Sequence, residues 1–231
     1  MSRTLNVVRM QLVNSQTYIW IPLIILGGSL LVSLAIYGIL DSSGIESPKY
    51  GGGAQAPLWY FLAVGVQALT LTFPFSQAMS VTRREFYLGT LLTAAMTAAI
   101  LSIVFVIGGF IERFTNGWGL NGYFFHLDWI WASGPFGALL FYFAVAMLCF
   151  VAGFWAATIY KRFGPTWLTV VLVGIGAVLV GILWLIGLGN AWGPVFTAIA
   201  GLGAVGFATC ALGLAAVLAV IAFGTLRRAV P

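Results

Sequence analysis

Residues that could carry out acid–base or nucleophilic chemistry are few and widely separated in this chain. The 231 residues include one histidine, His126, and five acidic residues. A serine or cysteine hydrolase needs a histidine base beside its nucleophile, and a zinc site needs several His, Cys or acidic ligands at short spacing. Neither pattern occurs in the sequence. An intramembrane enzyme is therefore the least favoured class of function, and we expect no metal or other cofactor on this chain.

Four of the acidic residues fall in two segments that separate long apolar runs. Asp41 and Glu46 lie in the first segment, and Glu112 and Asp128 lie in the second. An ionised side chain inside a bilayer is costly and commonly marks an ion or proton pathway. No charged residue stands in the middle of an apolar run, so an ion-coupled carrier lacks its usual groups. We predict that these carboxylates are solvated loop charges and that Glu112 reaches water at the outer end of a span.

The cysteines and a glycine run also receive structural interpretations. Cys149 and Cys210 lie within apolar runs and are predicted to be small packing residues.

Residues 51–53 are all glycine. They lie in the segment Asp41–Ala56, whose composition predicts a flexible exposed loop. A phosphate-binding P-loop ends in Lys-Ser or Lys-Thr, which this chain lacks. The chain itself is therefore not expected to bind ATP through that motif.

Uncharged polar residues gather on the apolar run that ends near Met79. They are Gln67, Thr70, Thr72, Ser76 and Gln77. Each could hydrogen-bond to another helix or line a path for a substrate. Packing between helices is the favoured interpretation, and a substrate path that includes Gln67, Thr70, Ser76 and Gln77 is the alternative.

The most polar stretch between two apolar runs is Phe73–Thr90, with the sequence FPFSQAMSVTRREFYLGT. The runs on either side are each long enough to cross a bilayer, so this stretch is predicted to turn at a membrane surface. Pro74 lacks a backbone N–H and should kink or end the preceding helix near the inner face.

A helix start is predicted further along this stretch, near Arg83. Thr82 followed three residues later by Glu85 is a capping-box pattern. The pattern indicates a short helix, parallel to the membrane, that presents Arg83, Arg84 and Phe86 to a soluble partner. The alternative is an anchoring turn whose arginines only set the topology.

Composition assigns the whole chain, residues 1–231, to a single all-α integral membrane domain. Hydrophobic residues make up 61% and charged residues 6% of the sequence, against about 25% charged in soluble domains. The basic residues come in small, widely spaced groups, so no nucleic acid partner is expected. Since about 20 apolar residues cross a bilayer, six spans are predicted, near Trp20–Leu40, Leu58–Met79, Thr90–Ile111, Gly134–Thr158, Thr166–Leu188 and Pro194–Thr225.

Residues 1–17 precede the first span and are predicted to form an amphipathic helix on the membrane surface. Leu5, Val8 and Leu12 recur at helical spacing, which would place an apolar stripe on one face, with Arg9 among the polar residues. A polar start to the first span is an equally weighted alternative.

The distribution of basic residues predicts the orientation. With the N terminus inside, eight Lys and Arg residues lie in inner segments and only Lys49 and Arg113 lie in outer loops. Such an excess of basic residues marks the cytoplasmic side. Both termini are therefore predicted to be cytoplasmic, in a multi-pass protein of the plasma membrane.

The segment from Pro74 to Thr90 resembles the link between spans two and three in permeases of the ABC-2 type. That family commonly shows a proline, a hydroxyl residue, two arginines, an acidic or small residue, an aromatic residue and a glycine in this order. The plan of about 230 residues, a surface helix and six spans with both ends inside is also similar. The short turn between spans five and six differs from lipid and sterol exporters of the family, which carry extra helices there.

This resemblance implies a bundle like that of type V ABC exporters and a role in ATP-driven export. It implies that residues 80–89 form a cytoplasmic coupling segment in which Arg83, Arg84, Glu85 and Phe86 contact the ATPase, and that residues 1–17 are the connecting helix. The implied partners are two copies of a separate ABC ATPase, which carries ATP and Mg, and a second permease copy or a related chain in the bilayer. The implied substrate is an amphipathic compound, an antibiotic or a peptide. The alternative is an ATP-independent six-span channel, facilitator or assembly factor.

Overall fold

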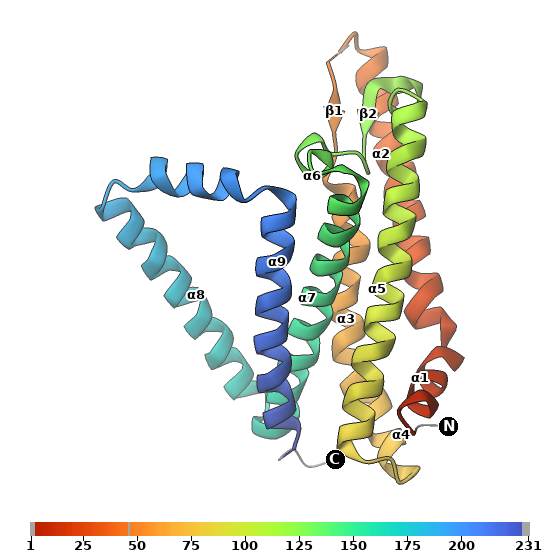
Figure 1. The fold of residues 1–231 in the computed structure, drawn as a ribbon, viewed down its shortest axis with the longest axis vertical. Helices are drawn as coiled ribbons and strands as arrows, with labels where there is room; N and C mark the ends of the chain where they lie inside the picture. Colours follow the sequence, from red (N-terminus) through yellow and green to blue (C-terminus); the bar gives the residue numbers. More distant parts are fainter. Residues whose placement is uncertain (1–2, 46, 228–231) are drawn as a thin grey trace.

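The computed structural model describes residues 3–45 and 47–227. These residues form a bundle of long helices with one two-stranded parallel sheet at one end (Figure 1). Three short π-helical or irregular turns and one 3-10 turn join the regular elements. The regular elements are α1 (Arg3–Val13), α2 (Ile21–Ser42), β1 (Lys49–Tyr50), α3 (Ala56–Gln67), α4 (Phe73–Ala78), α5 (Arg83–Phe114), β2 (Gly122–Tyr123), α6 (Asp128–Trp131), α7 (Gly134–Phe163), α8 (Pro165–Leu188) and α9 (Trp192–Leu226).

The prediction of an all-α multi-pass membrane protein is confirmed at this level. Six helical segments of the described chain are long and apolar enough to cross a membrane, because each exceeds the roughly 20 residues that a bilayer requires. They are Gln16–Ser42, Gly52–Ala78, Arg83–Phe114, Gly134–Phe163, Pro165–Leu188 and Trp192–Leu226.

Helix α7 is packed closely against α3 through a reciprocal pair of glycines. A Cβ atom on Gly65 of α3 would overlap the carbonyl oxygen of Phe150, and a Cβ atom on Gly153 of α7 would overlap the carbonyl oxygen of Leu62. Small residues let helix backbones approach closely where lipid supplies no hydrophobic driving force. Gly65 and Gly153 therefore serve packing within the bundle.

Helix α1 packs on the protein with a face that follows the predicted stripe only in part, with Val8 buried and Leu12 against the core. Val7, Val8 and Gln11 are buried, whereas Leu5 is 46% exposed. The Cβ atom of Val7 would lie 2.6 Å from a Cβ atom added to Gly89 of α5, so glycine there admits α1 against α5. The face of α1 that packs on protein thus differs from the predicted apolar face by about one position.

The second span is irregular but continuous around Pro74. A π-helical turn, Ala68–Thr72, connects α3 to α4, and Pro74 stands in the first turn of α4. A proline cannot donate the hydrogen bond that would continue the ladder, and a π turn is one way in which a helix absorbs that loss. The helix ends at Ala78, four residues after the proline.

The predicted short helix after Thr82 is wrong. Residues Arg83 to Phe86 are the first turn of α5, which continues unbroken to Phe114. The link between spans two and three is therefore only the four-residue loop 79–82. The capping box itself is confirmed, with the Glu85 N–H donating to Oγ1 of Thr82 over 3.3 Å and the Thr82 N–H donating to Oε2 of Glu85 over 3.0 Å.

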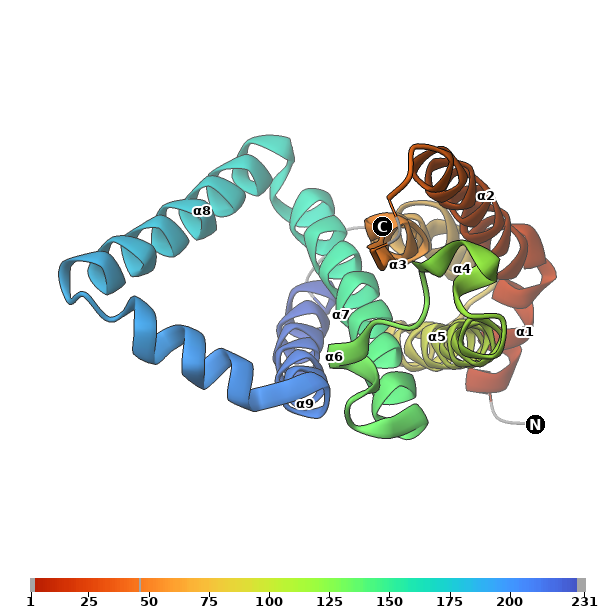
Figure 2. The ribbon, with the colours of Figure 1, turned by 90° about the horizontal axis from the view of Figure 1, so that it is seen from above.

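Helix α8 and the first part of α9 project from the bundle as an open arm (Figures 1 and 2). The predicted continuous sixth span is interrupted at Gly203, which has φ +57° in the left-handed region that favours glycine. Residues 192–202 run across the direction of the bundle, and residues 204–226 run along it beside α7. In α8 not one residue is buried within the chain.

Candidate functional site

The end of the bundle where α1 lies and α9 ends carries most of the described basic side chains. Arg83 at the start of α5 donates from Nη1 to the carbonyl oxygens of Leu226, over 3.3 Å, and Arg227, over 2.8 Å. Cations favour the C-terminal end of a helix because its last carbonyls lack partners. Arg83 therefore ties the loop between spans two and three to the end of the sixth span.

Tyr87, one turn further along α5, strengthens the same connection. Its hydroxyl donates to the carbonyl oxygen of Ala219 over 2.6 Å, and its ring lies 5.0 Å from that of Phe223. A movement of the loop 79–82 would thus be transmitted to α9 through two side chains of α5.

The four residues predicted to contact an ATPase occupy different environments. Glu85 is engaged in the capping box, and Arg83 caps α9. Phe86 is fully buried and packs 5.2 Å from the ring of Phe73, so a partner cannot reach it. Arg84 is exposed and has no polar partner within the described part of the chain. Of the four, Arg84 remains directly available to a soluble partner.

A groove of about 330 Å³ separates α1 from the loop 79–82 at this basic end. It is lined by Asn6, Val7 and Met10 from α1 and by Met79, Ser80 and Val81 from the loop. Ser80 has φ +57°, which turns the loop sharply at the groove. Sequence reasoning missed this groove, since it depends on how α1 docks on α5.

A second groove, of about 220 Å³, lies on the other side of Met10, between α1 and the second span. It is lined in part by Gln67, one of the four residues predicted as a substrate path. Thr70, Ser76 and Gln77 instead bond to backbone carbonyls at positions 66, 73 and 81, over 2.9, 2.7 and 3.1 Å. The structure does not bring the four residues together along one path.

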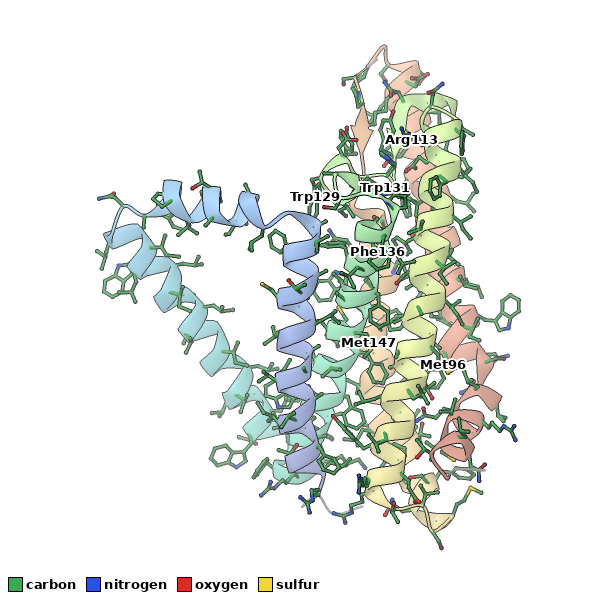
Figure 3. The ribbon with its side chains drawn as sticks, viewed as in Figure 1. Met96, Arg113, Trp129, Trp131, Phe136 and Met147 are labelled. Atoms are coloured by element: carbon green, nitrogen blue, oxygen red, sulfur yellow. The ribbon has the colours of Figure 1, made fainter. Side chains whose placement is uncertain are left out.

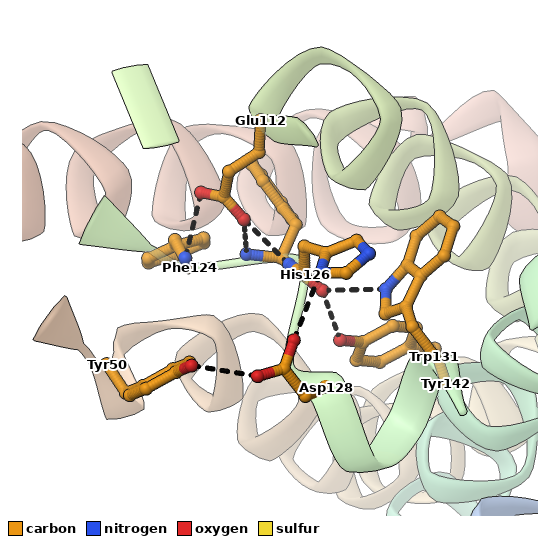
Figure 4. Close-up of polar contacts among 8 residues, drawn as sticks. Tyr50, Glu112, Phe124, His126, Asp128, Trp131 and Tyr142 are labelled. Atoms are coloured by element: carbon orange, nitrogen blue, oxygen red, sulfur yellow. Dashed lines mark hydrogen bonds and ion pairs between the residues drawn. The ribbon is translucent and has the colours of Figure 1, made fainter. Parts of the chain in front are cut away.

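At the opposite end, Glu112 is fully buried, which corrects the prediction of a solvated charge. Its Oε1 accepts from Trp118 Nε1 and Phe124 N, both over 2.8 Å. Its Oε2 accepts from Phe125 N over 2.7 Å and His126 N over 2.6 Å, and Figure 4 shows the bonds from the backbone N–H groups. Burying a charge is costly unless hydrogen bonds compensate it. Glu112 therefore organises the segment 118–126.

The loop Asp41–Ala56 is likewise more ordered than predicted. Lys49 is buried and bonds over 2.9 Å both to Asp41 and to the carbonyl oxygen of Leu120. β1 pairs with β2 in parallel, with Lys49 opposite Gly122 and Tyr50 opposite Tyr123. These contacts of residues 49–50 with residues 120–123 join the two loops into one cap. Glu46 lies outside the described residues.

The rim of this cap holds the histidine and one exposed acid. Tyr50 Oη donates to Asp128 Oδ2 over 2.9 Å, and His126 Nδ1 lies 3.8 Å from Asp128 Oδ1. The hydrogen bond to the Asp128 carboxylate raises the pKa of the Tyr50 phenol above its usual value. Trp129 and Trp131 lie nearby, below Arg113 in Figure 3; Trp129 is half exposed and Trp131 is buried.

The imidazole of His126 has one carboxylate within 4 Å, that of Asp128, and stacks on Trp131 at 4.7 Å between ring centroids. Among the described residues no group of three or more His, Cys, Asp or Glu is placed to hold a metal ion.

No protein-family model, curated protein or solved structure matches this chain. The resemblance to ABC-2 permeases therefore depends on the segment from Pro74 to Thr90 and on the six-span plan.

Proposed function

We propose that this chain is the transmembrane subunit of an ATP-driven ABC exporter in the plasma membrane, with its basic end in the cytoplasm. The observation that carries the proposal is the groove between α1 and the loop 79–82, beside the exposed side chain of Arg84. It supplies a recess, a basic residue and an open approach for a soluble partner. The partner is a separate ATPase, which brings ATP and Mg, and two copies serve one transporter.

The groove fits a partner that inserts an apolar side chain flanked by an acid. Val7, Met10, Met79 and Val81 supply apolar walls, and Arg84 stands two residues beyond the loop. Anchors that fill pockets dominate interface energies, and flanking charges steer association. Closure of the ATPases on ATP would press on the loop, and Arg83 and Tyr87 would carry that movement to α9.

The arm formed by α8 and the first part of α9 supports a second copy or a related chain as the membrane partner. Helix α8 contacts its own chain mainly at α7, where the chain turns at Gly164. A second bundle beside this arm would enclose a path between the two chains. The exported substrate would be an amphipathic compound.

Co-purification tests the proposal. The C-terminally tagged chain is extracted from its native membrane with and without a non-hydrolysable ATP analogue, and its partners are identified. We expect a Walker-motif ATPase in equal copy number, retained by Lys161→Glu and lost in Arg84→Glu. Lys161 is a matched control because it lies at the same end, at the end of α7 and away from the groove. Isolation of the chain without an ATPase from exporting cells would overturn the proposal in favour of an ATP-independent channel, facilitator or assembly factor.

A further inference from the structure

The second groove, between α1 and the inner half of the second span, contains an unpartnered buried amide. Gln11 is 2% exposed, and its Nε2 donates to Oγ1 of Thr90 over 2.7 Å. Its Oε1 finds no hydrogen-bond donor among the residues that the structure describes. Buried polar atoms nearly always have a partner, and an unsatisfied one needs an explanation. Gln11 also lines the 220 Å³ groove, so a ligand there would lie against this residue.

A second amide meets the same groove from the opposite wall. Gln67, the last residue of α3, lines the groove, and its side chain makes no hydrogen bond within the described chain. Asn14 and Thr72 add further polar groups, and no charged residue lines the groove. A bound ionic group would lose its hydration without meeting a counter-ion, which is strongly unfavourable. The lining thus selects an uncharged group that donates hydrogen bonds.

The position of the groove points to a ligand that comes from the lipid. Gln67 stands 11 residues before the end of the second span at Ala78, which is about 16 Å of helix at ~1.5 Å per residue. That is about half of the ~30 Å hydrocarbon thickness of a bilayer. Leu71 and Phe75 form the outer lip and are 69% and 56% exposed. A hydrocarbon tail can lie along these two side chains while its head group enters the groove.

We infer that this groove binds an uncharged, hydroxyl-bearing amphiphile with a hydrocarbon tail, taken from the leaflet at the basic end of the bundle. The head group donates to Oε1 of Gln11 and bonds to the amide of Gln67. The groove, with a volume of about 220 Å³, has room for the head group of a small polyol. Met10 lines both grooves, which places the ligand one side chain away from the proposed ATPase contact. This inference deepens the proposed exporter function by naming its substrate class.

Photolabelling of the purified full chain in lipid nanodiscs tests the inference. The probe is a monoacylglycerol with a diazirine in its tail, compared with the fatty acid and the lysophosphatidylcholine of the same tail. We expect the monoacylglycerol to label peptides that contain Leu71 and Phe75. Gln67→Leu should reduce this labelling about tenfold, which corresponds to the loss of about one hydrogen bond.

Gln16→Leu is the matched control, because Gln16 is exposed on the same inner segment and does not line the groove. Gln67→Leu is preferred to Gln11→Leu, since Gln11 also holds α1 on Thr90. The inference would be overturned if all three probes labelled the chain equally, or if Gln67→Leu and the wild type were labelled equally. The labelling would then reflect ordinary contact with lipid. Competition by tail-free glycerol would also overturn it, by showing a soluble polyol site.

The two proposals fail separately in this design. Labelling needs no ATPase. If an ATPase co-purifies with the chain but the probe does not label it, the exporter proposal stands and the proposed ligand is ruled out. If the probe labels the chain specifically but no ATPase co-purifies with it, the ligand site stands and the exporter proposal is ruled out.

Discussion

The indole of Trp118 donates from Nε1 to the buried carboxylate of Glu112 over 2.8 Å. Three consecutive backbone N–H groups, from Phe124 to His126, complete the environment of this carboxylate. Trp131 and Tyr142 then donate to the carbonyl oxygen of Phe125, over 3.2 and 2.9 Å. A single acid at the end of α5 therefore fixes the loop against α6 and α7.

Replacement of Glu112 tests this role. Glu112→Gln puts an NH₂ group against two N–H donors, so part of the buried network loses its acceptor. We expect the free energy of unfolding to fall by roughly 2 to 4 kcal/mol, seen as a lower Tm in nanodiscs and as cleavage of the segment 115–127 by added protease. Arg113→Gln, at the exposed neighbouring position, should change neither quantity. If both variants behave alike, Glu112 does not organise the cap.

The reciprocal glycine contact between α3 and α7 yields a packing prediction. Gly153→Ala would drive a Cβ atom into the carbonyl of Leu62, and backbone cannot move aside as a side chain does. We expect a loss of about 1 to 3 kcal/mol or more in the free energy of unfolding, measured by denaturant titration in detergent. Gly181→Ala on α8 is the control, because a Cβ atom there meets nothing within 4 Å. Equal stability of the two variants would contradict close packing at Gly153.

Arg83 and Arg84 are adjacent in sequence but should respond differently to truncation. Arg83→Ala removes two hydrogen bonds from the last carbonyls of α9, a loss of roughly 1 to 2 kcal/mol. Hydrogen exchange of the last turn of α9 should therefore accelerate in Arg83→Ala and stay unchanged in Arg84→Ala. Identical exchange in both variants would show that Arg83 is not a cap. It follows that Arg84, and not Arg83 or Glu85, is the position at which partner binding is tested without disturbing the helix ends.

The six spans and the capping box could be predicted because both are encoded locally. Each apolar run exceeds the bilayer thickness, and the capping box needs only Thr82 and Glu85. The environment of Glu112 could not be predicted, since its partners lie 6 to 14 residues away in a loop without periodicity. The break at Gly203 had no distinct signal among 29 glycines.

The two grooves and the packing of α1 could not be predicted either, because both depend on tertiary contacts. The apolar stripe Leu5, Val8 and Leu12 fits an isolated amphipathic helix, but Gly89 offers α1 a docking place on α5 that buries Val7 and Gln11 as well as Val8 and leaves Leu5 exposed. Of the predicted path, Gln67 alone lines the second groove. The facing Gln11 lies on α1 and Asn14 directly follows it, and the sequence pattern does not reveal the position of this helix.

The contact between Tyr50 and Asp128 predicts a pH dependence at the rim of the cap. The phenol donates to the carboxylate, which raises the pKa of Tyr50 above its usual value near ~10. A raised pKa in the folded state means that the contact stabilises the cap fully below the usual phenol pKa, and that this stabilisation is lost as the pH rises from there through the raised pKa of Tyr50.

Asp128→Asn removes the charge that raises this pKa, so the Tyr50 phenol should ionise at lower pH than in the wild type. The measurement is the phenolate absorbance of each protein minus that of its Tyr50→Phe counterpart, which isolates Tyr50 from the other seven tyrosines. His126→Gln serves as the control, because it leaves the Tyr50 to Asp128 hydrogen bond in place. An unchanged Tyr50 titration in Asp128→Asn would mean that the carboxylate does not hold the phenol, and the cap would then be closed at this rim by the stacking of Tyr50 on Tyr123 at 5.6 Å alone.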